Sequence, residues 1–150
     1  MARTAITPVQ LAYDAGVAQG SSGTVDATNG NIVAWAPSSS PATFGPFKVL
    51  LVVTNADSSS HTVILRGSGY TGAASGAANS GILPPQNTVF AQSTLGDLSV
   101  AVANGTTQVI GPLTTDRFTQ PISAGGGLWI DWSASTSMSV WVYQLPVDAV

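Results

Sequence analysis

The chain has 150 residues, which is enough for one ordinary domain with a sizeable core, and 44% of them are hydrophobic. Only 7% are charged, against roughly 25% in a typical soluble domain, and four basic residues stand against seven Asp with no Glu. This balance excludes the Lys/Arg stripe that nucleic-acid binding requires, and the lack of Cys excludes disulfides and thiolate metal sites.

Residues 1–24 are predicted to form a flexible N-terminal arm ahead of a single domain over residues 25–150. The apolar residues in this arm are sparse, and the Gly and Ser residues at 20–23 indicate a flexible joint. Gln10–Gln19 is predicted to form at most a weak helix. Such an arm either lies across a neighbouring molecule or frays. The first residues lack the apolar core of a signal peptide, and no run has the length of a membrane-spanning helix, so we expect a product made in a cytoplasm, without a membrane partner.

The densest apolar segment is Phe47–Gly67. Its first half, Val49–Val53, is a short continuous apolar run, which is typical of a strand buried on both faces. The polar residues Ala56–Ser60 indicate a turn, and His61–Arg66 indicate a second strand. We therefore predict a hairpin at the centre of a sheet.

Residues 67–87 are dominated by Gly, Ala and Ser and fit no regular element. A loop of this length inside a compact domain is uncommon and is usually functional or mobile. We expect either a loop that becomes ordered against a partner or a mobile excursion at the surface.

Short strands are predicted along the rest of the chain. Asp97–Ala103 alternates cleanly, the dipeptide Asn104-Gly105 marks a tight turn, and Leu128–Trp132 and Met138–Leu145 form the last two strands. Some eight to ten short strands without a convincing long helix predict an all-β protein, either an antiparallel β-sandwich or a jelly-roll-like barrel. The missing crossover helices exclude a parallel α/β fold.

The last two strands have aromatic side chains on the face opposite their aliphatic ones. In the strand 128–132, Trp129 points to the side opposite Leu128 and Ile130. In the strand 138–145, Trp141 and Tyr143 point to the side opposite Val140 and Val142. Since only one face of each strand can enter a core, the aromatic face is available for a subunit interface, for stacking on a sugar, or for covering by the arm or the 67–87 loop.

Enzyme chemistry has little support. His61 beside Asp57 and Ser58–Ser60 is more typical of a turn than of a catalytic triad, and no Gly-x-Ser-x-Gly elbow is present. The Asp residues are spread along the chain, mostly one to each turn or strand end, and so do not form a carboxylate pair. Asp131 is the one Asp that lies between two Trp in the sequence. No His pair, calcium loop or phosphate-binding glycine loop occurs. We expect a non-enzymatic protein without a cofactor or a metal.

A surface with so little charge repels neighbouring molecules weakly. We therefore expect much of it to be covered in an assembly. The alternative is a secreted, Ser/Thr-rich β domain with no partner.

Several short stretches occur along the chain in this order: Met1–Pro8, Asp26–Gly30, Val53–Asn55, Gly96–Val100, Ile110–Pro112 followed by Arg117-Phe118, and Trp129–Asp131 followed by Tyr143–Pro146. Together they resemble small head proteins of tailed bacteriophages, especially phages of actinobacteria, which are encoded close to the major capsid protein. The likeness covers most of the chain.

The resemblance implies a capsid decoration, or cement, protein. Such proteins are β-rich, often trimeric, and clamp the outside of the expanded shell where capsomers meet, so the implied partners are the major capsid protein and further copies of the chain. The implied location is the outer capsid surface of the virion. The residues we expect at the capsid are Arg3, Ile6, Val9, Leu11, Tyr70, Ile82 and Leu83, and those we expect between copies are Trp129, Trp141 and Tyr143. The alternatives are a carbohydrate-binding or host-adhesion module on the virion, or a tail subunit.

Overall fold

A computed structural model describes residues 2–33, 48–67, 97–114, 118, 120 and 127–145. The elements whose bounds fall within these residues are all strands, as the sequence predicts. The strands are β1 (Thr4–Ile6), β2 (Val9–Gln10), β3 (Asn31–Val33), β4 (Lys48–Asn55), β5 (His61–Leu65), β6 (Leu98–Val102), β7 (Thr106–Thr114), β8 (Leu128–Trp132) and β9 (Met138–Gln144).

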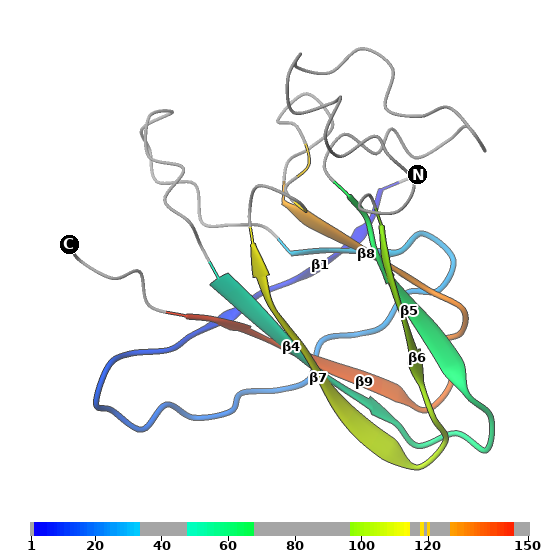
Figure 1. Cartoon of the computed structure of the whole chain (residues 1–150), viewed down its shortest axis with the longest axis horizontal. Coiled ribbons are helices and arrows are strands. Elements are labelled where there is room, and N and C mark those ends of the chain that lie inside the picture. Colours follow the sequence, from blue (N-terminus) through cyan, green and yellow to red (C-terminus); the bar gives the residue numbers. More distant parts are fainter. Residues whose placement is uncertain are drawn as a thin grey trace.

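The strands form two facing sheets (Figure 1). Sheet A has the order β1-β3-β8-β5-β6, and sheet B has the order β2-β9-β4-β7. The predicted β-sandwich is confirmed. Neighbouring strands are antiparallel except for β1–β3 and β2–β9, which are parallel, so both sheets are mixed.

Successive strands mostly alternate between the two sheets. Only β5 and β6 follow one another within the same sheet, and every other connection between the described strands leads from one sheet to the other. Beside β2, Gly23 adds an isolated antiparallel bridge to Val140 of β9. The resulting order, in which β2 and Gly23 flank β9-β4-β7 opposite β3-β8-β5-β6, is of the jelly-roll kind.

The predicted central hairpin is wrong. β4 lies between β9 and β7 in sheet B, whereas β5 lies between β8 and β6 in sheet A. The turn between them therefore crosses the sandwich. The buried Asn55 holds this crossing together, since its Nδ2 donates to the carbonyl oxygens of Ser59 (2.8 Å) and Val102 (3.0 Å), the latter in β6 of the other sheet. Asn104-Gly105 likewise leads from β6 in sheet A to β7 in sheet B.

The expected burial of β4 on both faces is wrong within this chain. Val49, Leu51 and Val53 point into the core, but Leu50 and Val52 are only half-buried on the outer face of sheet B. A continuous apolar run thus supplies both the core and a second apolar surface. The inner faces of the two sheets supply the other core residues, including Val33, Val63, Leu65, Val102, Leu128, Ile130, Val140 and Val142.

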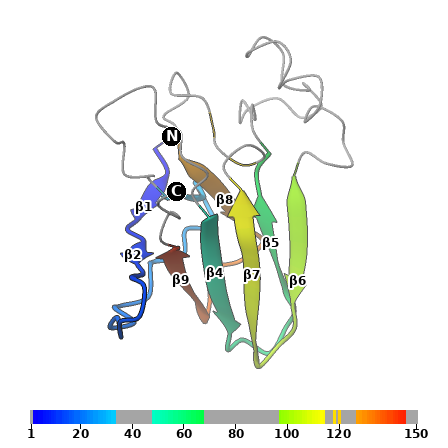
Figure 2. The same cartoon turned by 60° about the vertical axis from the view of Figure 1, so that its left-hand side comes forward.

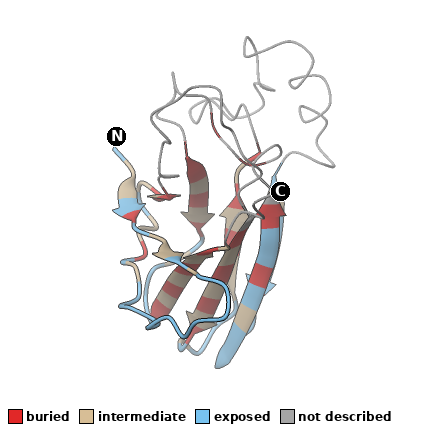
Figure 3. Cartoon of the chain, turned by 90° about the vertical axis from the view of Figure 1, so that its left-hand side faces the viewer, coloured by how far each residue is buried: buried red, intermediate tan, exposed pale blue. Residues whose placement is uncertain are grey.

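The N-terminal segment is partly built into the sandwich. β1 joins the edge of sheet A, β2 joins the edge of sheet B, and Ile6 is 4% exposed within the core. Residues 11–22 alone leave the sheets, and they contain no helix. Figure 3 shows this stretch as a largely exposed loop, together with the largely exposed edge strand β7. Only residues 11–22 therefore resemble the predicted arm.

Three pairs of neighbouring strand ends lie at one end of the sandwich (Figure 2). Val33 lies beside Leu128, Leu65 beside Leu98, and Lys48 beside Thr114. The predicted loop over 67–87, with its candidates Tyr70, Ile82 and Leu83, falls outside the described residues except for Gly67.

Candidate interaction surfaces

The outer face of sheet B has an apolar row across three strands. It consists of Leu50 and Val52 in β4, Val109 in β7, and Trp141 and Tyr143 in β9. Val52 has Trp141 as its partner on one side and Val109 on the other, and Leu50 has Tyr143. Val109 is 66% exposed. Three neighbouring outward residues of this face, Thr54, Thr107 and Ser139, are polar and uncharged.

The aromatic residues predicted to share an interface are divided between the two sheets. Trp141 and Tyr143 belong to the apolar row on sheet B, but Trp129 lies on the outer face of sheet A. There the guanidinium carbon of Arg3 lies 4.4 Å from the centre of the Trp129 ring, a cation–π contact. The three residues cannot form one patch, because the outer faces of a sandwich point in opposite directions.

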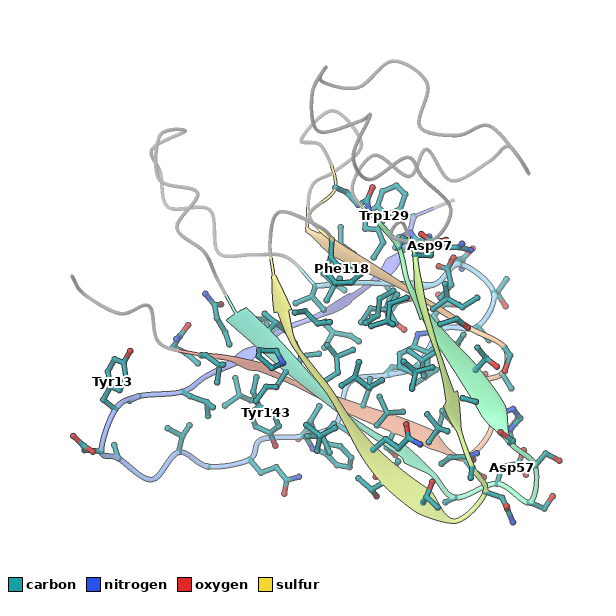
Figure 4. All side chains as sticks on the ribbon, viewed as in Figure 1. Tyr13, Asp57, Asp97, Phe118, Trp129 and Tyr143 are labelled. Carbon is teal, nitrogen blue, oxygen red and sulfur yellow. The ribbon has the colours of Figure 1, made fainter. Side chains whose placement is uncertain are left out.

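The loop over residues 11–22 is fixed at both ends to β9. Leu11 N donates to Gln144 O (2.9 Å) and Gly23 N donates to Val140 O (2.7 Å). The loop carries two exposed apolar residues, Tyr13 (58% exposed) and Val17 (39%). Figure 4 shows Tyr13 on the loop, well away from Tyr143 on the sheet. With Val109, these two are the large hydrophobic side chains most exposed in the described part of the chain.

The outer face of sheet A carries an ion-pair chain that the sequence did not predict. Asp131 accepts from Arg3 Nη1 at Oδ1 (2.5 Å) and from Arg66 Nε at Oδ2 (2.6 Å). Arg66 Nη1 also lies 2.7 Å from Asp97 Oδ2. The alternation of Trp129 and Asp131 places both on this face, but the Arg partners come from segments distant in sequence, next to β1 and β5.

An open hollow of about 380 Å³ lies beside this chain of charges, lined by Arg3, Asn29, Gly30, Ile64, Arg66, Asp131 and four neighbours. The charges in its wall are already paired, since Asp131 lies between the two Arg side chains. No group of three or more potential metal ligands occurs within the described ranges. Nor does the part of the chain that the structure describes contain a helix long and apolar enough to cross a membrane.

His61 and Asp57 form a local contact at the crossing between β4 and β5. His61 Nε2 lies 2.7 Å from Asp57 Oδ2, and Asp57 Oδ1 accepts from Ser58 N (2.7 Å). The hydrogen bond with His61, followed by that from Ser58 N, lowers the pKa of Asp57. Ser58 contacts the carboxylate rather than the imidazole, so the order of contacts in a Ser-His-Asp triad is not reproduced.

Two polar side chains tie the N-terminal segment to the sheets. The fully buried Asn31 donates from Nδ2 to Thr4 O (3.0 Å) and Thr24 O (2.9 Å), and its Oδ1 accepts from Asp26 N (3.0 Å) and Trp132 Nε1 (2.7 Å). Asp26 accepts from the backbone of Asn29 and from the hydroxyl of Thr4, and these bonds lower its pKa to about 2.

These contacts revise the residues expected at a capsid. Ile6 is buried in the core and Arg3 is paired with Asp131, so neither projects as an anchor in this fold. Val9 is half-buried beside Tyr143, and Leu11 is half-buried at the base of the 11–22 loop. Tyr13 was not predicted from the sequence, because its neighbours are too small and mixed to show a period.

No protein-family model, curated protein or solved structure matches the chain.

Proposed function

We propose that the protein is a structural component of a phage virion that decorates the outer surface of the head and stabilises the shell. The observation that carries the proposal is the apolar row on sheet B. In a chain with 7% charged residues, five apolar side chains lie side by side on a face that no described segment covers. A face of this kind is typical of a surface that is buried in an assembly.

The fold and the resemblance support the same proposal. A jelly-roll-like strand order occurs in viral capsid domains, although it also occurs in lectins, so the fold alone does not decide the function. The stretches quoted from the sequence resemble phage head proteins from Met1–Pro8 to Tyr143–Pro146. The same resemblance implies the major capsid protein as partner.

The proposed mechanism is mechanical. Each copy would bury apolar area across neighbouring capsid subunits, which contributes roughly 25 cal/mol per Å² before the losses of association. Many equivalent sites on the lattice would raise the avidity further. Separating two capsomers would then require exposing this area, so decorated shells would resist internal pressure better than bare ones.

The sequence predicts capsid contacts in the N-terminal segment and in the 67–87 loop. Deleting residues 1–20 is a poor test, because it removes β1, β2 and a core side chain. Replacing residues 68–96 by a short Gly/Ser linker is better. Leu65 pairs with Leu98, and Gly67 N donates to Asp97 Oδ1 (2.7 Å), so the two ends already meet.

The test is co-sedimentation with heads of the parent phage that lack this chain, followed by cryo-electron microscopy. The wild type and a Ser99→Asp control should bind, with density on the outer surface of the shell. The linker variant should keep its thermal unfolding transition but lose binding. If the linker variant occupied the shell as fully as the wild type, the capsid contact would lie outside residues 68–96. Density confined to the tail, or none, would refute head decoration.

A further inference from the structure

Two Asn-Gly dipeptides occur in the sequence, at residues 29–30 and 104–105, and the structure describes both. Asn is chemically labile, most of all before Gly, because a residue without a Cβ leaves its backbone nitrogen open to the preceding side chain. The two glycines have similar φ angles of +75° and +66°. The dipeptide and this angle do not distinguish the two sites, so a difference in reactivity has to arise from their surroundings.

The first dipeptide is held by Asp26. Gly30 N donates to Asp26 O (2.9 Å), and Asn29 donates to the Asp26 carboxylate from its backbone N (2.9 Å) and from Nδ2 (3.2 Å). Gly30 is buried, and Arg3 Nη1 and Asp131 Oδ1 occupy the space where a Cβ would lie. The Asn29 side chain cannot reach the Gly30 nitrogen until several of these contacts are broken.

The second dipeptide lies in the turn between β6 and β7, where both residues are exposed. A Cβ at Gly105 would meet nothing within 4 Å. The hydrogen bonds of this turn come from Thr106, whose N (3.3 Å) and hydroxyl (2.8 Å) both donate to Ala103 O. Within the described ranges, neither the Asn104 amide nor the Gly105 N–H forms a hydrogen bond. The attacking nitrogen and the side-chain carbon that it attacks are therefore both accessible.

We propose that Asn104 is a site of spontaneous deamidation in the folded protein, and that the fold protects Asn29 from the same reaction. The Gly105 nitrogen attacks Asn104 Cγ, the bond from Cγ to Nδ2 breaks, and the amide hydrogen of Gly105 leaves with ammonia as a five-membered succinimide closes. Water then adds to one carbonyl of this ring and breaks one C–N bond, which gives aspartate or isoaspartate. Each event makes the net charge of −3 one unit more negative. This inference is independent of the proposed function.

The test is ageing of the purified full-length chain in mildly alkaline buffer, followed by anion-exchange chromatography and by peptide mapping with electron-transfer fragmentation. Asn104 should convert to aspartate and isoaspartate, and the isoaspartate shows passage through the ring, because direct hydrolysis of the amide gives aspartate alone. Asn29 should convert at least about tenfold more slowly, because several hydrogen bonds must break first. Asn104→Asp serves as the standard for the charge shift.

The same chain unfolded in urea is the matched control, since it keeps both dipeptides and loses the contacts. Both sites should then convert at similar rates. Asn104→Gln should abolish conversion at this turn in the folded chain, because the longer side chain would have to close a larger ring. Equal rates at the two sites in the folded chain, an Asn104 that reacts only in urea, or aspartate without isoaspartate would each overturn the proposal.

Discussion

Asn31 shows how one side chain organises the packing of the N-terminal segment. It is fully buried, and both ends of its amide are used: the nitrogen bonds the segments around Thr4 and Thr24, and the oxygen bonds Asp26 N and the indole of Trp132. A buried polar group is tolerated when its hydrogen bonds are satisfied. This residue joins β3, β8 and the N-terminal segment in one network.

Replacing Asn31 by Ala should destabilise the fold by about 2–4 kcal/mol, because it leaves the Trp132 N–H and backbone groups buried without partners. Urea unfolding followed by tryptophan fluorescence would measure this. The control is Asn104→Ala at an exposed turn, which should change stability by about 0.5 kcal/mol or less. Equal losses in the two variants would contradict the role of Asn31.

Asp26 makes stability depend on pH in the acid range. Its native hydrogen bonds favour the ionised form and hold its pKa at about 2, below the ordinary value of 3.8. The stabilisation is therefore fully present above pH 4 and disappears as the pH falls towards 2.

The Asp26→Asn variant should be less stable than the wild type at pH 6, because an amide cannot accept as many hydrogen bonds. The difference between their melting temperatures should shrink as the pH is lowered from 4 to 2. Thermal unfolding of both proteins at a series of pH values would measure it. A difference that stays constant over this range would show that Asp26 does not titrate as described.

At the scale of elements, sequence pattern predicted the strands but not their partners. The strands expected at 49–53, 61–66, 128–132 and 138–145 are present with nearly the expected bounds. Their partners differ because turn residues such as Ala56–Ser60 serve a hairpin and a crossing between sheets equally well. What selects the crossing is non-local: the contact of Asn55 with Val102, 47 residues away.

Gly30 and Gly105 offer a comparison of two glycines with similar positive φ angles. Their φ angles are +75° and +66°, in the left-handed region that favours glycine. A Cβ at Gly30 would clash with Arg3 Nη1 and Asp131 Oδ1, whereas a Cβ at Gly105 would meet nothing within 4 Å.

Gly105→Ala should therefore destabilise the protein by about 1–2 kcal/mol, which is the cost of the left-handed backbone conformation for a residue with a Cβ. Gly30→Ala should destabilise it by more, because it also breaks the pair between Arg3 and Asp131. Urea unfolding of the two variants under identical conditions would compare them. Equal losses would mean that the ion pair adjusts without loss.

At the scale of the whole molecule, the two broad faces of the sandwich differ. The outer face of sheet A holds the paired charges of Arg3, Arg66, Asp97 and Asp131, while the outer face of sheet B holds the apolar row. Alternation along Leu128–Trp132 and Met138–Leu145 predicted an aromatic outer face for each strand. It did not predict that these faces point in opposite directions, because the sheet to which a strand belongs is not a local property.

The N-terminal strands protect the edges of both sheets. Removing residues 2–10 deletes the buried side chain of Ile6 and should expose the edges of β3 and β9, whose unpaired backbone groups can pair with other molecules. We expect this truncated chain to aggregate on refolding, as followed by light scattering. A chain in which residues 12–21 are replaced by a short linker keeps both strands and should refold without aggregation. Clean refolding of the truncated chain would contradict the protective role.

The pairing of β2 with β9 also sets the timing of folding during synthesis. Gln10 and Gln144 are partners 134 residues apart, so the first strands emerge from the ribosome long before β9 exists. Contacts between such distant residues form slowly. Until β9 has emerged, sheet B lacks the strand between β2 and β4, and the inner face of β4 has no complete core to cover it. The nascent chain therefore completes sheet B only after β9 has emerged.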